Sequence, residues 1–577
     1  MAARLKASTV EVEKVEHQGK NLENIVVGKV ISCEKHPNAD KLKVCMVDIG
    51  VGAEYFQPTK AGSAGAQNIV PVHSGVVQIV CGGSNVAEGM LVALAKVGAK
   101  VKWHGEGELV ELKPVAIRGV ESAGMICAST EIGLGEMFPL KEEKEILDLT
   151  NKVWVENLQP LRPGTPLAKA LGLDDAVLEI DNKSLSNRPD LWGHYGIARE
   201  AAVLFGKKLS AKGASAPDIK GGKDIKLEVK VEDVKLCPRY LAVAMSGIKV
   251  GPSPAWMQKS LSAVGLRPIN NIVDITNYIM MDLGQPMHAF DYKQLTTNNK
   301  QLTITVRTAK DGEEFTTLDG QKRKLDSSML MITNGDKNLA IAGVMGGEES
   351  GINEQTETII FESANFDASS IRKTSTKLGL RTDSSSRFEK SLDPNLAKMA
   401  LQKAVELVKD CCPQAKVSSN LADEKKFNLK QGPITISFAW LEKQLGMEIP
   451  KKEIVRILTQ LGFEVKNKGE ELAIKIPTWR ATKDISIPED LVEEIIRIYG
   501  FDKIAPQMPV FPINPPEVNK LLNLERLCKN TLVNSLAYTE VYNYSFVSPQ
   551  SIAKLGQDIS KHLELENPLS QERPFLR

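Results

Sequence analysis

The chain lacks the cysteine spacing that builds zinc sites and disulfide frameworks. Its eight cysteines are scattered, none forms a C-x-x-C pair, and only Cys411 and Cys412 are close together. Zinc modules and disulfide-stapled secreted domains both need regularly spaced cysteines. The sequence therefore predicts a reducing compartment and no zinc site.

The chain also lacks a charge excess and a long apolar run. Its formal net charge is +1, so a contact with nucleic acid must come from a local patch, and the basic excess of a nucleic-acid chaperone is missing. No apolar run reaches the length of a membrane span, and the first residues lack a signal-peptide core. We expect a cytoplasmic protein, and a chain of this length is expected to form about four domains.

Short alternating runs separated by polar turns dominate residues 21–165. Five or so such strands are typical of a small β-barrel of the OB type, in which residues 51–75 form a loop insertion. Basic side chains on such a barrel either bind nucleic-acid backbone or only face solvent, and the pattern alone favours the second. The cations concerned are Lys35, Lys41, Lys43 and Arg118.

Several segments here resemble known tRNA-binding proteins. HPNADKL, IVCGGSNV and IRGVESAGMICAS are similar to the tRNA-binding OB domain of several synthetases. Further on, NRPDLWGHYGIARE resembles the junction segment of bacterial phenylalanyl-tRNA synthetase β subunits. In that family the junction pairs with the N-terminal strand. The resemblance thus implies that residues 1–20 and 165–205 form one small domain, split by the barrel at 21–165.

Residues 206–425 alternate predicted strands and helices, which indicates a mixed α/β domain. The stretch 269–292 combines an apolar helical run with a turn and then His288 in an apolar frame. Buried polar groups need partners, so the stretch forms either a pocket wall or a helix followed by a satisfied core histidine, which the stretch alone favours. A polar loop is predicted over 376–394, followed by a helix with Asp393 as its N-cap and Pro394 at its first position.

Seven residues of this domain match, in order and with their flanks, the editing site of the same family. The resemblance implies hydrolysis of tRNA(Phe) mischarged with tyrosine. In that role Glu362 accepts the phenolic proton, and His288 or a backbone amide near Gly346 forms a further hydrogen bond with the hydroxyl. Phenylalanine would leave these buried groups unpaired, at a cost of about 1–3 kcal/mol each. Because the sequence shows no Ser–His–Asp or Cys–His pattern, water is the expected nucleophile. The seven are Thr276, Asn277, His288, Gly346, Glu362, Thr382 and Ser384.

A basic group lies beside this set. Arg387, with Arg381 and Lys390, is expected to contact the acceptor end of tRNA. Ser391 stands where the family commonly has glycine, so the sequence leaves the backbone geometry at this position open.

Residues 428–505 alternate helix and strand, and the resemblance implies a small DNA-binding-protein-like α/β domain. Residues 486–489 form a capping-box pattern before a helix. Carboxylates at i, i+3 and i+4 follow, and they either favour the helix dipole or hold a hard cation. The match to the family's magnesium site implies Mg²⁺ bound by Asp484, Asp490, Glu493 and Glu494.

The last region, 506–577, begins with a proline-rich linker and a predicted helix at 519–538. The resemblance implies the start of a class II synthetase-like domain. Family members begin with a helix-bearing segment and continue past the NPLS motif, so we expect the chain to be incomplete at both ends.

Taken together, the resemblance implies a multidomain α+β chain that takes part in phenylalanine–tRNA ligation. The implied assembly has two α and two β chains; α binds ATP and phenylalanine, and this chain supports α, binds tRNA(Phe) and edits. The alternative is a non-enzymatic tRNA-binding or scaffold protein with a silent editing pocket.

Overall fold

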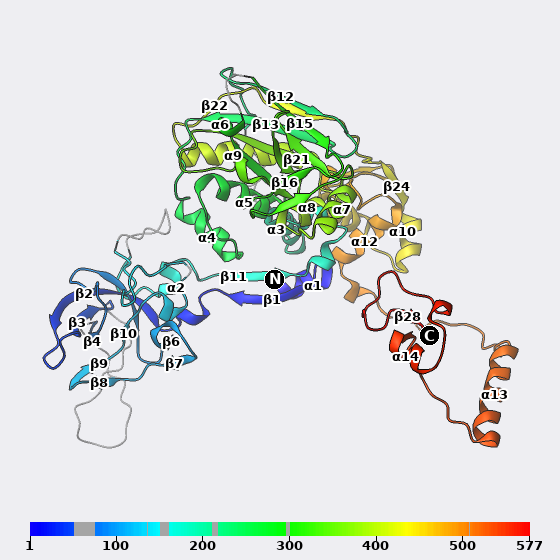
Figure 1. Ribbon diagram of the computed structural model, residues 1–577, viewed down its shortest axis with the longest axis horizontal. Helices are drawn as coiled ribbons and strands as arrows, with labels where there is room; N and C mark the ends of the chain where they lie inside the picture. Colours follow the sequence, from blue (N-terminus) through cyan, green and yellow to red (C-terminus); the bar gives the residue numbers. More distant parts are fainter. Residues whose placement is uncertain (51–74, 136, 151–160, 210–216, 296–300, 507) are drawn as a thin grey trace. The chain divides into compact units, whose positions relative to one another are not determined.

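The computed structural model describes residues 1–577 except 51–74, 136, 151–160, 210–216, 296–300 and 507. The predicted loop insertion at 51–75 therefore lies outside the described residues, apart from Gly75. The chain forms two compact units, Met1–Ile504 and Ala505–Arg577, each containing helices and strands (Figure 1). Among the described residues, no helix has both the length and the apolar character needed to cross a membrane.

The N-terminal segment is a helix followed by a strand. Helix α1 (Ala2–Ser8) precedes β1 (Val12–His17), which pairs antiparallel with β11 (Ala176–Ile180). The expectation that an N-terminal helix is absent is wrong. Seven residues form a helix here because Leu5 is fully buried, and tertiary packing stabilises helices too short to form alone.

A five-stranded antiparallel sheet follows, with the order β10-β5-β2-β3-β4. Its long strand β2 contributes to two cores: Ile25 and Val27 pack in one, and Val26 and Val30 in the other. A register irregularity between Val30 and Ser32 bends the strand, as bulges do. The result is a barrel-like sheet. Its strands are β2 (Ile25–Lys35), β3 (Lys43–Asp48), β4 (Val76–Cys81), β5 (Leu91–Ala95) and β10 (Met125–Ile126). Two short strand pairs come between β5 and β10 in the sequence: β6 (Lys100–Lys102) with β7 (Leu109–Glu111), and β8 (Val115–Ile117) with β9 (Val120–Ser122).

Two further five-stranded sheets form the middle of the chain. The first has the order β14-β21-β13-β22, with β23 also paired to β13, and the second has the order β12-β15-β18-β19-β20. The first contains β13 (Arg239–Ser246), β14 (Met287–Asp291), β21 (Thr358–Asn365), β22 (Lys416–Val417) and β23 (Ala422–Lys425). The second contains β12 (Lys226–Val231), β15 (Gln301–Thr308), β18 (Leu330–Thr333), β19 (Asn338–Ile341) and β20 (Met345–Gly346).

Alternating side chains of the first sheet pack into two different cores. Val243 and Phe361 pack with helices α4 (Ala255–Ala263), α5 (Asn271–Leu283) and α9 (Leu396–Cys411), which lie together in Figure 1. Tyr240 and Phe290 point the other way and pack with the second sheet. Because successive residues of a strand face opposite sides, His288 and Glu362 share the face of Tyr240 and Phe290.

Two predictions in this region need correction. Residues 376–394 are not one loop, because they contain the end of α7 (Ala368–Leu378) and all of α8 (Asp383–Phe388), which Phe388 anchors in the core. Helix α9 starts at Leu396 with Asn395 as N-cap, and Asp393 instead accepts a hydrogen bond from the Asn395 backbone. Ser391 has φ 63°, the left-handed conformation that glycine adopts most easily.

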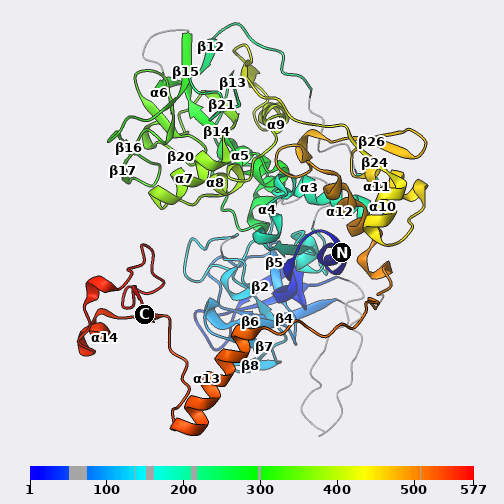
Figure 2. The ribbon, with the colours of Figure 1, turned by 90° about the vertical axis from the view of Figure 1, so that its right-hand side faces the viewer.

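Residues 434–499 form a three-stranded sheet with three α-helices. Figure 2 labels β24, β26, α10, α11 and α12 of this segment. The sheet order is β24-β26-β25, and apolar residues of α12 share a core with Leu5 of α1. The predicted capping box is wrong in detail: the Asp490 carboxylate, rather than Glu489, accepts from the backbone of Ser486 and Ile487. The elements are β24 (Ile434–Ser437), α10 (Phe438–Leu445), α11 (Lys451–Gln460), β25 (Glu464–Asn467), β26 (Glu471–Lys475) and α12 (Pro488–Tyr499).

The second unit is small and largely exposed. It contains α13 (Lys520–Leu536), α14 (Pro549–Lys554) and the strand pair β27 (Phe546–Val547) with β28 (Phe575–Leu576). No residue of α13 is buried. The chain is thus a multidomain mixture of helices and sheets with one barrel-like sheet, while the OB-type, DNA-binding-protein-like and class II assignments and the domain boundaries stay predictions.

Candidate functional site

A cavity of about 100 Å³ opens at the edge of the first sheet. Strand β14 contributes His288, β21 contributes Glu362, β20 contributes Gly346, and α8 contributes Ser384. Apolar side chains, among them Ile332, Ala340, Ile341 and Phe388, complete the lining. Four of the seven residues that the sequence singled out are therefore brought together in a mainly apolar cavity with few polar groups, a composition typical of a ligand site.

His288 enters this cavity as a neutral imidazole. Burial lowers its pKa to about 4, and its ring packs edge-on against Phe290 with 4.6 Å between centroids. Its Nε2 atom is buried and has no hydrogen-bond partner among the described residues. A buried unpaired nitrogen costs free energy, so this atom is available to a ligand. The interpretation of His288 as a satisfied core histidine is not what the structure shows.

Glu362 lies directly opposite His288 in the β14–β21 register. Its side chain is almost fully buried, and the Tyr240 hydroxyl donates a 2.6 Å hydrogen bond to its Oε2 atom. Burial raises the pKa of Glu362 to about 7, although the hydrogen bond from Tyr240 opposes this. The carboxyl group therefore changes charge near neutral pH.

A glycine allows the second sheet to approach the imidazole. A Cβ atom on Gly346 would lie 2.8 Å from Cε1 and 3.0 Å from Nε2 of His288. The neighbouring turn is held by side-chain hydrogen bonds, since Ser384 donates to the Gly343 carbonyl at 3.1 Å and Thr382 donates to the Val344 carbonyl at 2.9 Å. Thr382 thus supports the turn rather than lining the cavity.

Replacing Gly346 by alanine is expected to displace the His288 ring and destabilise the domain by about 1–3 kcal/mol, the usual effect of overpacking. NMR spectra of the histidine side chains should show a shifted His288 signal. Gly251→Ala is the matched control, because a Cβ there meets no atom within 4 Å. An unchanged His288 signal in Gly346→Ala would contradict the packing described above.

Thr276 and Asn277 are not among the residues that line the cavity. Both lie in α5, which packs on the opposite face of the sheet from His288 and Glu362. The Thr276 hydroxyl donates to the Val273 carbonyl of its own helix at 2.7 Å. The stretch 269–292 therefore forms helix α5 and strand β14. The helix packs on one face of the first sheet, and His288 of the strand lies on the other face. Gly284, which has φ 81°, follows the end of the helix.

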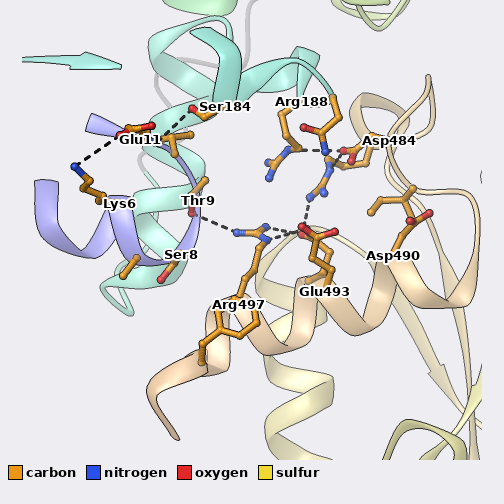
Figure 3. Close-up of a pocket in the computed structure, with 17 residues that line it drawn as sticks. Lys6, Ser8, Thr9, Glu11, Ser184, Arg188, Asp484, Asp490, Glu493 and Arg497 are labelled. Carbon is orange, nitrogen blue, oxygen red and sulfur yellow. Dashed lines mark hydrogen bonds and ion pairs between the residues drawn. The ribbon is translucent and has the colours of Figure 1, made fainter. Parts of the chain in front are cut away.

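A second group of charged side chains alternates in sign around a cavity of about 290 Å³ (Figure 3). Arg480 contacts Asp484 and reaches Glu494 at 2.7 Å, and Arg497 bridges Glu494 and Glu200 at 2.7 Å each. Further ion pairs extend the group: Glu200 also pairs with Arg188, and Asp190 pairs with both Arg188 and Arg199. Four guanidinium groups balance four carboxylates, and the charges hold the pKa values of Asp190 and Glu494 well below their usual range despite burial.

This arrangement does not fit the predicted magnesium site within this chain alone. Asp484 and Glu494 are already neutralised by arginines, Asp490 caps α12, and Glu493 is exposed. Among the residues that the structure describes, no group of three or more histidine, cysteine or acidic side chains is arranged to hold a metal ion. A dication here would have to displace Arg480 or Arg497.

The predicted cations of the barrel-like sheet gather around the turn at 36–42. Lys35 and Lys43 are paired across β2 and β3, Lys41 is exposed in the turn, and Arg118 exchanges backbone and side-chain hydrogen bonds with Asn38. The Lys43 ammonium also donates to the Val86 carbonyl at 2.8 Å. Three exposed cations and one partly engaged cation thus share one end of the sheet.

Arg387 differs from its prediction. Its guanidinium is buried and donates to the Trp192 carbonyl, to Asp383 and to the Met281 sulfur, so it acts in packing and does not face a nucleic acid. The Arg381 side chain, which is 68% exposed, is the accessible cation of this group.

Comparison with known proteins assigns a family. Models of four domains match the chain: a putative tRNA binding domain at 25–60, a B3/4 domain at 236–413, a tRNA synthetase B5 domain at 434–501, and a phenylalanyl tRNA synthetase beta chain CLM domain at 504–577. The phenylalanine–tRNA ligase beta subunit of Clostridium acetobutylicum is 38% identical over 100% of this chain and 67% of its own length. This chain belongs to the bacterial phenylalanine–tRNA ligase beta-subunit family.

Two other beta subunits match this chain with similar identity and coverage. The beta subunit of Solibacter usitatus is 38% identical over 99% of this chain and 66% of its own, and that of Bacillus subtilis is 34% identical over 100% and 66%. The chain thus spans about two thirds of the length of these beta subunits. The cavity with His288 and Glu362 falls inside the B3/4 match, and the turn at 36–42 falls inside the tRNA-binding match.

Sequence reasoning missed Tyr240 and the arginine partners of the acidic residues. Tyr240 occurs in an ordinary apolar strand, CPRYLAVAMSGI, where an aromatic residue suggests only core packing. A signal was nevertheless present, because a tyrosine inside a buried strand needs a partner for its hydroxyl.

Proposed function

We propose that this chain acts as the β-type component of a phenylalanine–tRNA ligase, binds tRNA(Phe), and hydrolyses tRNA(Phe) mischarged with tyrosine in the cavity of His288 and Glu362. Its proposed partner is an α subunit, in an assembly of two α and two β chains in which α binds ATP and phenylalanine. The single observation that supports editing best is the pair of His288, whose Nε2 is unpaired, and Glu362 in one cavity lined largely by apolar residues.

The cavity suits a phenol. Ionised Glu362 accepts a hydrogen bond from the tyrosine hydroxyl, and Nε2 of His288 forms a second hydrogen bond with the same hydroxyl. Phenylalanine offers no hydroxyl to Glu362 or to Nε2 of His288, which disfavours it by about 1–3 kcal/mol per hydrogen bond not made. Because Gly346 has no Cβ, the backbone of β20 lies against the His288 ring.

Hydrolysis then needs a positioned water. Water adds to the ester carbonyl, the bond to the terminal ribose oxygen breaks, and free tyrosine and tRNA leave. At neutral pH the His288 imidazole is already neutral, so it orients groups by hydrogen bonding and cannot deliver a proton as an acid. No step of this mechanism uses the carboxylates that pair with Arg480 and Arg497.

Deacylation of tyrosyl-tRNA(Phe) tests the proposal. We expect Glu362→Gln and His288→Ala each to slow the reaction about 5- to 100-fold, the equivalent of a buried hydrogen bond of about 1–3 kcal/mol. The control is Glu357→Gln, an exposed acid just before β21 that should deacylate at the wild-type rate. Equal rates in all four proteins would contradict the assignment.

The scaffold alternative gives a different result in the same assay. A protein that only binds tRNA would retain tRNA(Phe) on a filter but leave the tyrosyl ester intact at the rate of buffer. Co-purification with an α subunit, followed by a phenylalanylation assay, tests the proposed assembly separately from editing.

A further inference from the structure

Tyr240 is a buried residue that touches the candidate site without lining it. It lies in β13, beside the β21 strand that contains Glu362, and its side chain has no exposed surface. Its hydroxyl donates to one carboxylate oxygen of Glu362 at 2.6 Å. A phenol buried this completely holds its position by packing, so it fixes the carboxyl group to which it donates.

We propose that Tyr240 is a positioning residue that holds Oε2 of Glu362 and thereby presents Oε1 to the hydroxyl of a bound tyrosyl group. This inference rests on the function proposed above and names the residue that sets its specificity. An ionised carboxylate accepts several hydrogen bonds, so one internal and one ligand phenol can share it. The internal phenol keeps its proton, because burial and the nearby Glu362 both raise the pKa of Tyr240.

The surroundings of Glu362 make Tyr240 its main internal partner. The titratable groups near it are Tyr240 of β13, His288 of β14 and Cys237, which lies just before β13, and burial keeps the thiol and the imidazole neutral at pH 7. The second sheet contributes Ile332, Ala340, Ile341 and Gly346 to the cavity, and α8 contributes Ser384 and Phe388. None of these six is charged.

The Tyr240 hydroxyl therefore favours the ionised form of Glu362. Burial disfavours the charged form, and the hydrogen bond from Tyr240 is the group that opposes it. Without the hydroxyl, Glu362 holds its proton to higher pH. A protonated carboxyl has lost the charge that makes it a strong acceptor for the substrate phenol.

The test is Tyr240→Phe, which removes one oxygen and keeps the packing. Infrared titration of the 577-residue protein should show the Glu362 carboxyl band, identified by its loss in Glu362→Gln, titrating about one to two pH units higher in the variant. The low-pH limb of tyrosyl-tRNA(Phe) deacylation should move upward with it, so that the rate falls about tenfold at pH 7 and the difference narrows by pH 8.5. Tyr278→Phe, on α5 against Trp256, is the control and should change neither measurement.

The outcomes separate this inference from the proposed function. An unshifted Glu362 band in Tyr240→Phe, or a rate loss that is the same at every pH, would overturn the positioning role. If Glu362→Gln deacylates at the wild-type rate, the editing assignment fails, and the infrared titration alone still decides whether Tyr240 sets the charge of Glu362.

Discussion

Replacing Arg480 by methionine is expected to destabilise helix α12 by about 3–5 kcal/mol. The side chain is 2% exposed and joins Asp484 to Glu494. Methionine fills a similar volume but leaves two buried carboxylates short of a partner, and an uncompensated buried charge is among the most costly single changes in a protein. Hydrogen exchange of the α12 amides should therefore accelerate by about 10²- to 10⁴-fold.

A matched arginine exists on the neighbouring helix. Arg456 of α11 pairs with Glu453 at the surface, where its side chain is 44% exposed, and Arg456→Met should change α12 exchange by less than about 1 kcal/mol. Magnesium removal with a chelator should leave exchange in the wild-type chain unchanged, because guanidinium groups already neutralise the cluster. Slow exchange in Arg480→Met, or a strong chelator effect, would show that the ion-pair network does not hold this helix.

The second large effect concerns pH and Glu362. Its folded pKa of about 7 lies above the ordinary value of 4.5, so between these values the folded chain binds more protons than the unfolded chain. Stability from this group is then fully present below about pH 4.5 and is lost as pH rises through 7. Since each pKa unit corresponds to about 1.4 kcal/mol, Glu362→Gln should be more stable than the wild type by up to about 3 kcal/mol at pH 8 and nearly equal to it at pH 5.

Urea unfolding at the two pH values measures this difference. His288 has the opposite trend, because its lowered pKa makes the folded state lose stability as pH falls from 6.5 towards 4. That contribution is present in both proteins and cancels in the comparison. Glu357→Gln provides the exposed control. If the wild type is as stable as Glu362→Gln at pH 8, then ionisation of the buried Glu362 carboxyl does not lower the free energy of unfolding.

Much of the local structure follows from the sequence. The helix at Leu396–Cys411 was predicted from its apolar spacing, and the strand that contains Glu362 was also predicted. Helix α8 was missed because its residues 383–386 are polar, whereas the burial of Arg387 and Phe388 and the cap from Thr382 stabilise it. Helix propensity is a weak predictor where tertiary contacts determine whether a segment becomes helical.

By itself, the sequence determined which residues are available and, through the combination of its motifs, the family. It also identified His288, Gly346, Glu362 and Ser384 as members of one set, which the structure brings into one cavity. Only the tertiary structure decided the roles of their neighbours. Tyr240 holds Glu362 from 122 residues away, while Arg188 reaches Asp484 and Glu200 pairs with Arg497 of α12 from another part of the chain.

The same difference explains the corrected residues. Arg387, Asp484 and Glu494 look alike in sequence, as charges beside apolar positions, yet the guanidinium of Arg387 is buried by packing and the two carboxylates are neutralised by arginines. A charge acquires its function from what surrounds it: burial shifts its pKa, and a partner of opposite charge decides whether it can bind anything else. Part of those surroundings comes from distant segments, since Trp192 lies 195 residues from Arg387 and Glu200 lies 297 residues from Arg497, and local patterns do not contain such contacts.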